Sequence, residues 1–345
     1  MLQYFFIRTK RRLKAKLARN NWKLSFGRGK FLRWGGFFSL LLLILQISPS
    51  VAGSYKKQEG GDVAGTAKSP SAEEVELEEQ IEERITYPHR IAESRSFPDL
   101  TARAVVIVDE ETDKVLYEQN ADIRFPPASL TKMMTALVAL DIYEFYEVIT
   151  VPEQCSQDMV GTAQMGLVEN ERITVETLLY GLLMNSAADA ACVLVNGVGE
   201  ERLFISLMNQ KAAELGLADT HFVNAVGFDH VEQYSTAEDL VTMAQIVMDN
   251  NILRKIVGTQ QLDRGNVYDN PTRWHELHST NQLLTSLPGV TGVKTGKTDD
   301  AGECLAISWM WEGRELYAVI LGSDDRFGEM GEVIKWVQES FRAHP

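Results

Sequence analysis

Apolar runs typical of β-strands lie at both ends of the region that can fold, and a long helical block lies between them. Residues 104–108 read AVVIV, residues 109–113 are polar enough for a turn, and residues 114–117 return as a hairpin partner. After residue 289 the runs VTGVKT, ECLAISWMW and ELYAVILG follow, and the tight Glu312-Gly313 turn joins the last two. We therefore expect one antiparallel sheet assembled from both ends of the chain, in an α+β fold.

The helical block covers residues 173–250, and its last helix begins with a capping-box pattern, Ser235-Thr236-Ala237-Glu238. The chain closes on a further amphipathic pattern, RFGEMGEVIKWVQESFRAHP. We expect this last segment to be a helix that packs on the sheet.

The first 33 residues hold 11 Lys and Arg and no acid, and no charged residue lies between Arg33 and Lys56. The apolar centre of this uncharged stretch, Phe37 to Ile47, and the small residues of Ser50-Val51-Ala52 are typical of a secretory signal. We assign residues 1–52 to a basic leader followed by a signal peptide or signal anchor. The body is then expected outside the cytoplasm, secreted or anchored to the outer face of the bacterial cytoplasmic membrane, with this segment as its only membrane contact.

Residues 53–98 are rich in Gly, Ser, Ala and Glu and are assigned to an acidic low-complexity linker, and residues 99–345 to the folded domain. Beyond residue 33 the chain carries 23 basic and 48 acidic residues. So acidic a body argues against nucleic acid as a partner.

Ser129 and Lys132 lie three residues apart in PPASLTKMMTALVAL, so they share a helix face with the serine at its N-terminal turn. The lysine amine can take the serine proton only when it is neutral, which burial and a second nearby cation would favour. The spacing alone is weak, because average composition predicts about one such match in a chain of this length. Ser54 and Lys57 in the linker repeat it where nothing can bury an amine.

Lys294-Thr295-Gly296 ends a predicted strand and supplies the candidate second cation. Lys294 and Thr295 suit a substrate carboxylate, and Gly296 would let a substrate lie against the strand without a Cβ in the way. A third element, Asn185-Ser186, interrupts an apolar helical run. Ser186 either caps a helix or points into the site.

Together these three elements resemble the penicillin-binding, serine-type D-alanyl-D-alanine carboxypeptidases, the low-molecular-mass D,D-peptidases. The resemblance runs from about Ala102 to the last helix and includes MNQKAAELGLADTHFVNAVGFDH and NQLLTSLPGVTGVKTGKTDDAG. It implies a penicillin-binding/β-lactamase-like fold, in which helices flank a five-stranded antiparallel sheet and an all-helical subdomain adjoins it.

The resemblance also implies roles for individual residues. Ser129 would be the nucleophile, Lys132 its base and Ser186 a proton relay toward the leaving D-alanine. Lys294 and Thr295 would hold the terminal carboxylate of a peptidoglycan stem peptide, and the N–H groups of Ser129 and Lys297 would form the oxyanion hole. β-Lactam antibiotics are the expected inhibitors, and no metal or cofactor is implied.

Ala188 departs from the family pattern, which has an asparagine two residues after the second serine. The adjacent Asn185 is expected to point elsewhere, so substrate positioning should be weaker by about 1–3 kcal/mol. The alternatives are a D,D-endopeptidase that cuts crosslinks and a wall-binding protein with weakened catalysis. A β-lactamase is disfavoured because no clear glutamate motif serves deacylation.

The three cysteines, Cys155, Cys192 and Cys304, show no metal-ligand spacing, and the setting of Cys192 in ADAACVLV is typical of core packing. His275 and His278 are three apart in an extended segment, so their side chains should diverge rather than share a zinc ion.

Overall fold

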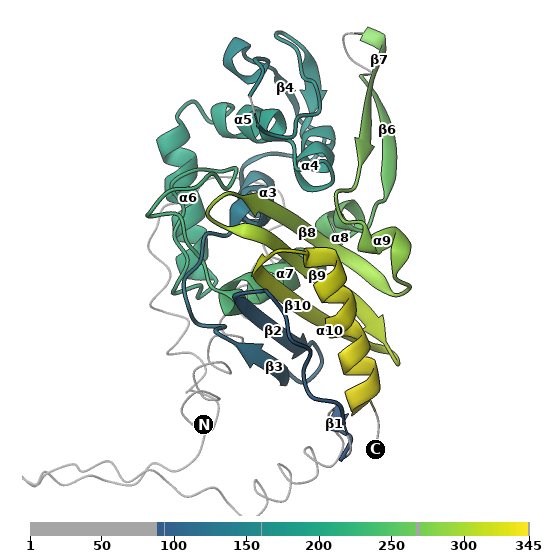
Figure 1. The fold of residues 1–345 in the computed structure, drawn as a ribbon. Coiled ribbons are helices and arrows are strands. Elements are labelled where there is room, and N and C mark those ends of the chain that lie inside the picture. Colours follow the sequence, from purple (N-terminus) through teal and green to yellow (C-terminus); the bar gives the residue numbers. More distant parts are fainter. Residues whose placement is uncertain (1–87, 93, 160, 267–269, 344–345) are drawn as a thin grey trace, which may run out of the picture. The chain divides into compact units, whose positions relative to one another are not determined.

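A computed structural model describes residues 88–92, 94–159, 161–266 and 270–343 (Figure 1). The predicted leader and signal, 1–52, and the predicted linker up to residue 87 lie outside the described residues. No helix within the described ranges is both long and apolar enough to span a bilayer.

Five strands form the main sheet, in the order β3-β2-β10-β9-β8, and every neighbouring pair is antiparallel. The strands are β2 (Ala104–Asp109), β3 (Val115–Gln119), β8 (Val290–Thr298), β9 (Gly302–Trp311) and β10 (Arg314–Ser323). Strand β10 joins the two N-terminal strands to the two other C-terminal ones, so the predicted sheet built from both chain ends is confirmed. Glu312 and Gly313 both have positive φ, 48° and 84°, as a two-residue hairpin turn requires.

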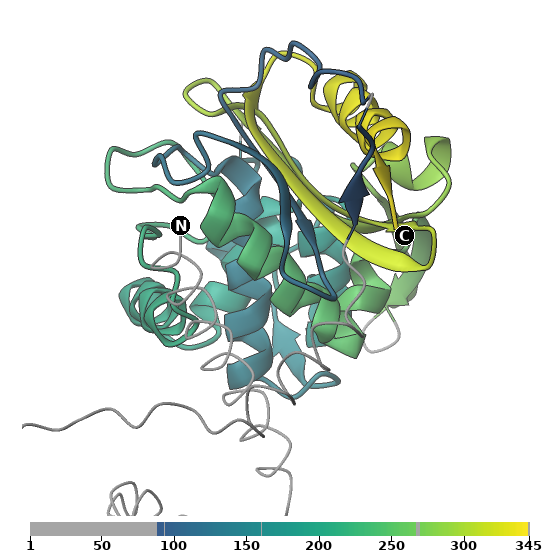
Figure 2. The same cartoon turned by 90° about the horizontal axis from the view of Figure 1, so that it is seen from below.

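Both faces of the sheet are buried, and alternate residues of each strand face different cores. On β2, Val106 and Val108 face the core shared with the helical block, whereas Val105 and Ile107 face the core beneath α10 (Arg326–Ser340). Figure 2 shows α10 on one side of the sheet and most of the other helices on the opposite side, while Leu283 and Leu284 of the short helix α9 (Leu283–Ser286) belong to the core beneath α10. This two-sided burial explains why β2 is a continuous apolar run.

The segments around the nucleophile candidate and the helical block supply the remaining helices. They are η1 (Ala128–Thr131), α3 (Lys132–Ile142), α4 (Val175–Leu183), α5 (Ala188–Asn196), α6 (Glu201–Glu214), α7 (Ala237–Asp249), α8 (Asn251–Val257) and α9 (Leu283–Ser286). At the start of α7 the predicted capping box is one residue out of register. Thr236, not Ser235, accepts the capping hydrogen bond, from the N–H of Asp239 at 3.1 Å.

Small two-stranded sheets accompany the helices and were not predicted. Strand β4 (Val148–Thr150), followed by the short helix η2 (Glu153–Cys155), pairs with β5 (Arg172–Thr174), and β6 (Gln261–Asn266) pairs with β7 (Asn270–His278). The β6–β7 hairpin projects beside α4 in Figure 1.

Residues 88–98 contact the body, although the sequence assigned them to the linker. Strand β1 (His89–Arg90) pairs with β11 (Phe341–Arg342), which follows α10 in the chain. Phe97 stacks on Tyr117 and meets Trp336 edge-on, with 4.9 Å between the ring centroids of the latter pair. These contacts tie the two ends of the described chain together.

Candidate active site

Ser129 and Lys132 lie where the short helix η1 passes into α3. The Lys132 Nζ is 2.9 Å from the Ser129 Oγ, and the lysine side chain is buried, with 3% of its surface exposed. The residues that follow Lys132 in the first turns of α3 are buried as well, so the lysine stem is packed within the protein. The structure therefore brings the two residues together as their spacing predicted.

The Lys132 amine has one further acceptor, the backbone carbonyl of Val226 at 2.9 Å, which the Ser129 hydroxyl also reaches at 3.4 Å. Burial lowers the pKa of Lys132 from 10.5 to about 7. A large fraction of the amine is then neutral at neutral pH, and a neutral amine can accept the serine proton.

The edge strand β8 runs past the serine. Lys294 is 1% exposed, and its Nζ donates to the Thr295 carbonyl at 3.1 Å. Burial lowers the pKa of Lys294 well below 10.5, and the positive charges of Lys132 and Arg326 lower it further. The two lysines thus interact as expected, but burial rather than Lys294 is the cause of the lowered pKa of Lys132.

The other residues of this motif line a cleft of about 500 Å³ that also contains Ser129 and Lys132. Thr295, Gly296 and Lys297 are on its surface, whereas Lys294 is covered. The Lys297 ammonium turns away to pair with Glu303 at 3.0 Å, so only its backbone can serve as an oxyanion donor.

Gly296 has a structural role that differs from the one expected. A Cβ at this position would come within 2.9 Å of both the Ser129 nitrogen and the Ala128 Cβ. Glycine therefore allows η1 to lie directly against the strand. Its missing Cβ makes room for the segment that carries Ser129, whereas the sequence suggested that it makes room for a bound substrate.

Ser186 lies in the turn between α4 and α5, has φ +58°, and lines the cleft. Ala188, the first residue of α5, also lines it and is 2% exposed. Asn185 points away, as predicted: its amide donates to the Gln164 carbonyl and accepts from the His278 N–H. No asparagine is among the described residues that line the cleft.

Sequence reasoning missed several further parts of the cleft, among them residues 161–163, Thr298 and Asp299. The loop from Val226 to Asp229 forms one wall, and Thr280 and Arg326 lie near Thr295. The hydroxyls of Thr280 and Thr295 are 2.6 Å apart, and Arg326 donates to the Gly296 carbonyl at 2.8 Å. The sequence VNAVGFDH, which contains the loop, carries no pattern that indicated its role. Nothing in the sequence around Arg326 distinguishes it from a surface residue of a terminal helix.

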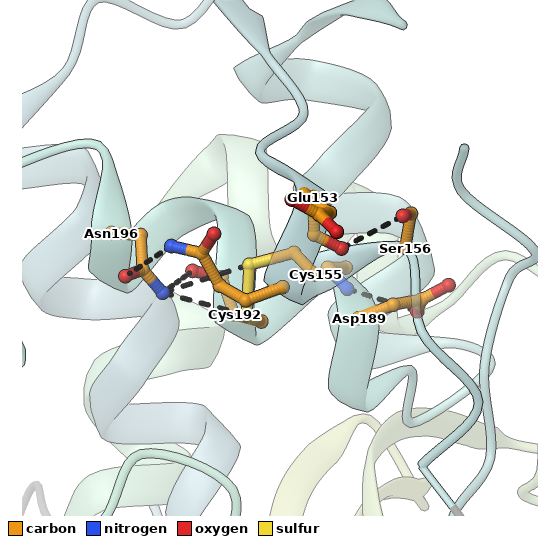
Figure 3. The surroundings of a disulfide bond; sticks show 8 residues. Glu153, Cys155, Ser156, Asp189, Cys192 and Asn196 are labelled. Carbon is orange, nitrogen blue, oxygen red and sulfur yellow. Dashed lines mark hydrogen bonds between the residues drawn. A yellow bond between two sulfur atoms is a disulfide. The ribbon is translucent and has the colours of Figure 1, made fainter. Parts of the chain in front are cut away.

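The expectation that Cys192 is simple core packing is wrong, because Cys192 forms a disulfide with Cys155, with 5.5 Å between their Cα atoms (Figure 3). Figure 3 also shows Asn196, whose amide donates to the Cys192 carbonyl at 2.9 Å. The disulfide closes residues 155–192 into a ring, and this ring carries Gly161, Thr162, Ala163, Ser186 and Ala188 of the cleft. Cys304 is free and buried.

His275 and His278 diverge as predicted, the first buried and the second exposed. His275 Nε2 lies 2.7 Å from a carboxylate oxygen of buried Glu171, and its Nδ1 lies 3.1 Å from the Met165 carbonyl. This pair pins the β6–β7 hairpin to the loop that follows the cleft wall.

A serine at the start of a helical segment, a buried lysine beside it and a second lysine on the facing sheet edge define an active-site-serine protein with a penicillin-binding type of fold. The chain belongs to the D-alanyl-D-alanine carboxypeptidase family, whose sequence model matches residues 91–325. The family predicted from the motifs is thereby confirmed.

Individual relatives agree with this assignment. The chain is 30% identical to D-alanyl-D-alanine carboxypeptidase DacF of Bacillus subtilis over 71% of its own length and 64% of that protein, so it spans less than two thirds of this relative. It is 28% identical to a D-alanyl-D-alanine endopeptidase of Escherichia coli, over 72% of this chain and 80% of that one. The crystal structure of the Streptomyces K15 DD-transpeptidase superposes with a TM-score of 0.67 at 29% identity, over 71% of this chain and 99% of that one.

Proposed function

We propose that this protein is an extracytoplasmic serine-type D-alanyl-D-alanine carboxypeptidase that removes the terminal D-alanine from peptidoglycan stem peptides. The observation that carries the proposal is the buried Lys132 amine, 2.9 Å from the Ser129 hydroxyl and with its pKa lowered to about 7. Such a pair can perform nucleophilic acyl transfer without a metal ion.

In the first step Lys132 takes the Ser129 proton while Oγ attacks the carbonyl carbon of the penultimate residue. The negative charge that develops on the carbonyl oxygen is stabilised by the N–H groups of Ser129 and Lys297, which both belong to the cleft. The C–N bond then breaks, Ser186 relays to the leaving amine the proton that Lys132 took, and D-alanine departs. Water hydrolyses the acyl-enzyme and restores the serine.

The end of the cleft near Thr295 suits the free carboxylate of the substrate. The hydroxyls of Thr280 and Thr295 lie 2.6 Å apart there, and the Arg326 guanidinium, which donates to the Gly296 carbonyl, adds positive charge to the same cleft. A carboxylate receptor of this kind suits a peptide that ends in D-alanine, because the free carboxylate of that residue can accept hydrogen bonds from hydroxyl and guanidinium donors.

The location is proposed from the uncharged apolar segment after the basic leader, which would deliver or anchor the body outside the cytoplasm. The disulfide Cys155–Cys192 supports it, since such bonds persist in oxidising compartments. β-Lactams are the proposed inhibitors, because Ser129 would attack their strained amide in the same way.

The test uses the purified protein with labelled penicillin and with a diacylated peptide that ends in D-Ala-D-Ala. Labelling at Ser129 together with released D-alanine supports the enzyme. Labelling without turnover supports the wall-binding alternative that Ala188 motivates. If the protein shows neither labelling nor release of D-alanine, the serine mechanism is rejected. Cleavage of crosslinked muropeptides to monomers, in preference to release of D-alanine, would support the endopeptidase alternative, which the similarity to the E. coli endopeptidase favours.

A further inference from the structure

A loop covers Lys132, and its backbone geometry decides where the one carbonyl that the base contacts among the described residues lies. Val226 presents this carbonyl, 2.9 Å from the Lys132 Nζ and 3.4 Å from the Ser129 Oγ. If the carbonyl takes one amine hydrogen, the lone pair of a neutral amine can turn toward the serine hydroxyl.

Asn224 holds this loop in shape. Its Oδ1 accepts three consecutive backbone N–H groups, from Val226 at 3.2 Å, Gly227 at 2.7 Å and Phe228 at 3.0 Å. Its Nδ2 donates back to the Phe228 carbonyl at 3.1 Å. One side chain thus fixes both ends of the tight turn that contains the Val226 carbonyl.

A buried glutamine fastens Asn224 to the nucleophile segment. Gln233 is 1% exposed, and its Oε1 accepts the Asn224 N–H at 3.2 Å. Its Nε2 donates to the hydroxyl of Thr131, the residue before Lys132, at 3.1 Å. The hydrogen-bond network therefore runs from the Val226 carbonyl, which contacts Lys132, through Asn224 and Gln233 to Thr131, the residue before Lys132.

The loop also packs tightly against η1. Gly227 has φ +91°, and a Cβ there would come within 1.9 Å of the Ala128 carbonyl oxygen. Only glycine permits this approach. The loop and the nucleophile segment therefore form one rigid unit.

We propose that Asn224 is a positioning residue for the base: by fixing the turn that carries the Val226 carbonyl, it keeps the Lys132 amine dry and directed at Ser129. This inference rests on the proposed serine–lysine mechanism and adds a residue outside its reacting groups. Without Asn224 the turn relaxes, water reaches the amine, and the ammonium form is favoured.

The other charged groups around Lys132 do not provide an alternative explanation for such a change. Lys294 on β8 and Arg326 at the start of α10 are basic groups, which cannot stabilise an ammonium at Lys132, and burial is the cause of the lowered pKa of Lys132 itself. In the loop itself, Asp229 is held by the Thr298 hydroxyl and the Asp300 N–H. The Asp189 carboxylate on α5 accepts the N–H groups of residues 165–167.

The test compares Asn224→Ala with Asn209→Ala. Asn209 is a matched control because it also clamps this segment, through the N–H and carbonyl of Phe222, but makes no contact with the turn at Val226. In Asn224→Ala we expect the acidic limb of the kcat/KM profile to move up by about one pH unit, so that activity at pH 7 falls about fivefold and recovers at higher pH. kcat should fall while KM changes little, and Asn209→Ala should keep the wild-type limb.

A second readout does not depend on turnover. In protein labelled with [13C]lysine, the ε-carbon of Lys132, assigned by its loss in Lys132→Arg, should titrate at higher pH in Asn224→Ala than in the wild type. If the wild type releases no D-alanine, the proposed function fails while this titration still tests Asn224. Melting temperatures verify folding, and Asn224→Ser is the milder variant if the alanine variant does not fold. An unchanged limb and titration midpoint, or an equal shift in Asn209→Ala, would overturn the proposal.

Discussion

Gly296 and Ser129 lie so close that a single methyl group on the glycine would come within 2.9 Å of the serine backbone nitrogen. The edge of the sheet and the nucleophile segment are therefore in backbone contact. This contact sets the width of the cleft between them. A single added methyl group, as in Gly296→Ala, would widen the cleft.

Gly296→Ala should separate η1 from β8. We expect it to destabilise the fold by about 1–3 kcal/mol, as overpacking usually does, and to reduce acylation of Ser129 more than binding. Gly331→Ala on α10 is the control, because a Cβ there meets nothing within 4 Å and should leave activity unchanged. Urea unfolding and penicillin labelling rates measure both effects. Wild-type labelling by Gly296→Ala would show that the contact is not required.

Acylation should rise with pH around a midpoint near 7, the value to which burial lowers the pKa of Lys132. Below this pH the amine is protonated and cannot take the serine proton, and above it the amine is a free base. Rates of penicillin acylation across pH provide the measurement. A midpoint near the ordinary lysine value of 10.5 would contradict the assignment.

Lys294→Met distinguishes burial from repulsion as the cause of that midpoint. We expect the midpoint to persist in this variant, because burial alone accounts for the lowered pKa of Lys132. A clear upward shift would instead restore the second cation as the cause.

Ala188→Asn should place a side-chain amide in the cleft, where the described lining residues include no asparagine. We expect kcat/KM for a D-Ala-D-Ala peptide to rise by about 5- to 100-fold, which corresponds to about 1–3 kcal/mol of added transition-state stabilisation. Steady-state kinetics on both forms is sufficient. An equal or lower value would mean that the site has been rebuilt around alanine.

Thr280→Val should weaken recognition of the substrate carboxylate, because the valine keeps the shape but removes the hydroxyl that lies 2.6 Å from that of Thr295. We expect KM to rise by roughly 5- to 30-fold, or about 1–2 kcal/mol, for peptides with a free C-terminus. Thr285→Val, which removes an exposed hydroxyl on α9, is the control. Equal effects in the two variants would exclude a role for Thr280 in binding.

Removing the disulfide as Cys155→Ala/Cys192→Ala should cost about 3–4 kcal/mol of unfolding free energy, given the 37-residue separation. It should also loosen the cleft wall formed by residues 161–163, which lies within the ring. Cys304→Ala keeps the disulfide and serves for comparison. Denaturant titration that finds the two variants equally stable would contradict this view.

Much of the fold could be read from local patterns. Strands β2, β9 and β10 are apolar runs bounded by turn residues, and Glu312-Gly313 has the composition of a turn with two positive φ angles. Ser129, Lys132 and the β8 motif were found because short spacings encode them. Such features depend on neighbours in the chain, which a sequence displays directly.

The remaining features depend on distant partners. Nothing adjacent to Cys155 indicates that it meets Cys192, and nothing near Arg326 indicates that it reaches the Gly296 carbonyl. Asn224 stands in an ordinary loop until its three N–H partners and Gln233 are seen together. At α7 the pattern indicated a cap at Ser235, whereas the Ser235 hydroxyl pairs with that of Thr220 and Thr236 caps the helix.

The order of the strands has a consequence for when the protein can act. The serine is synthesised early, but the strand that borders it arrives only with the last quarter of the chain. A nascent polypeptide therefore carries a hydroxyl with no opposing wall, and competence appears only after the final strands have docked. Loss of those strands by proteolysis would remove it again while leaving the serine itself untouched.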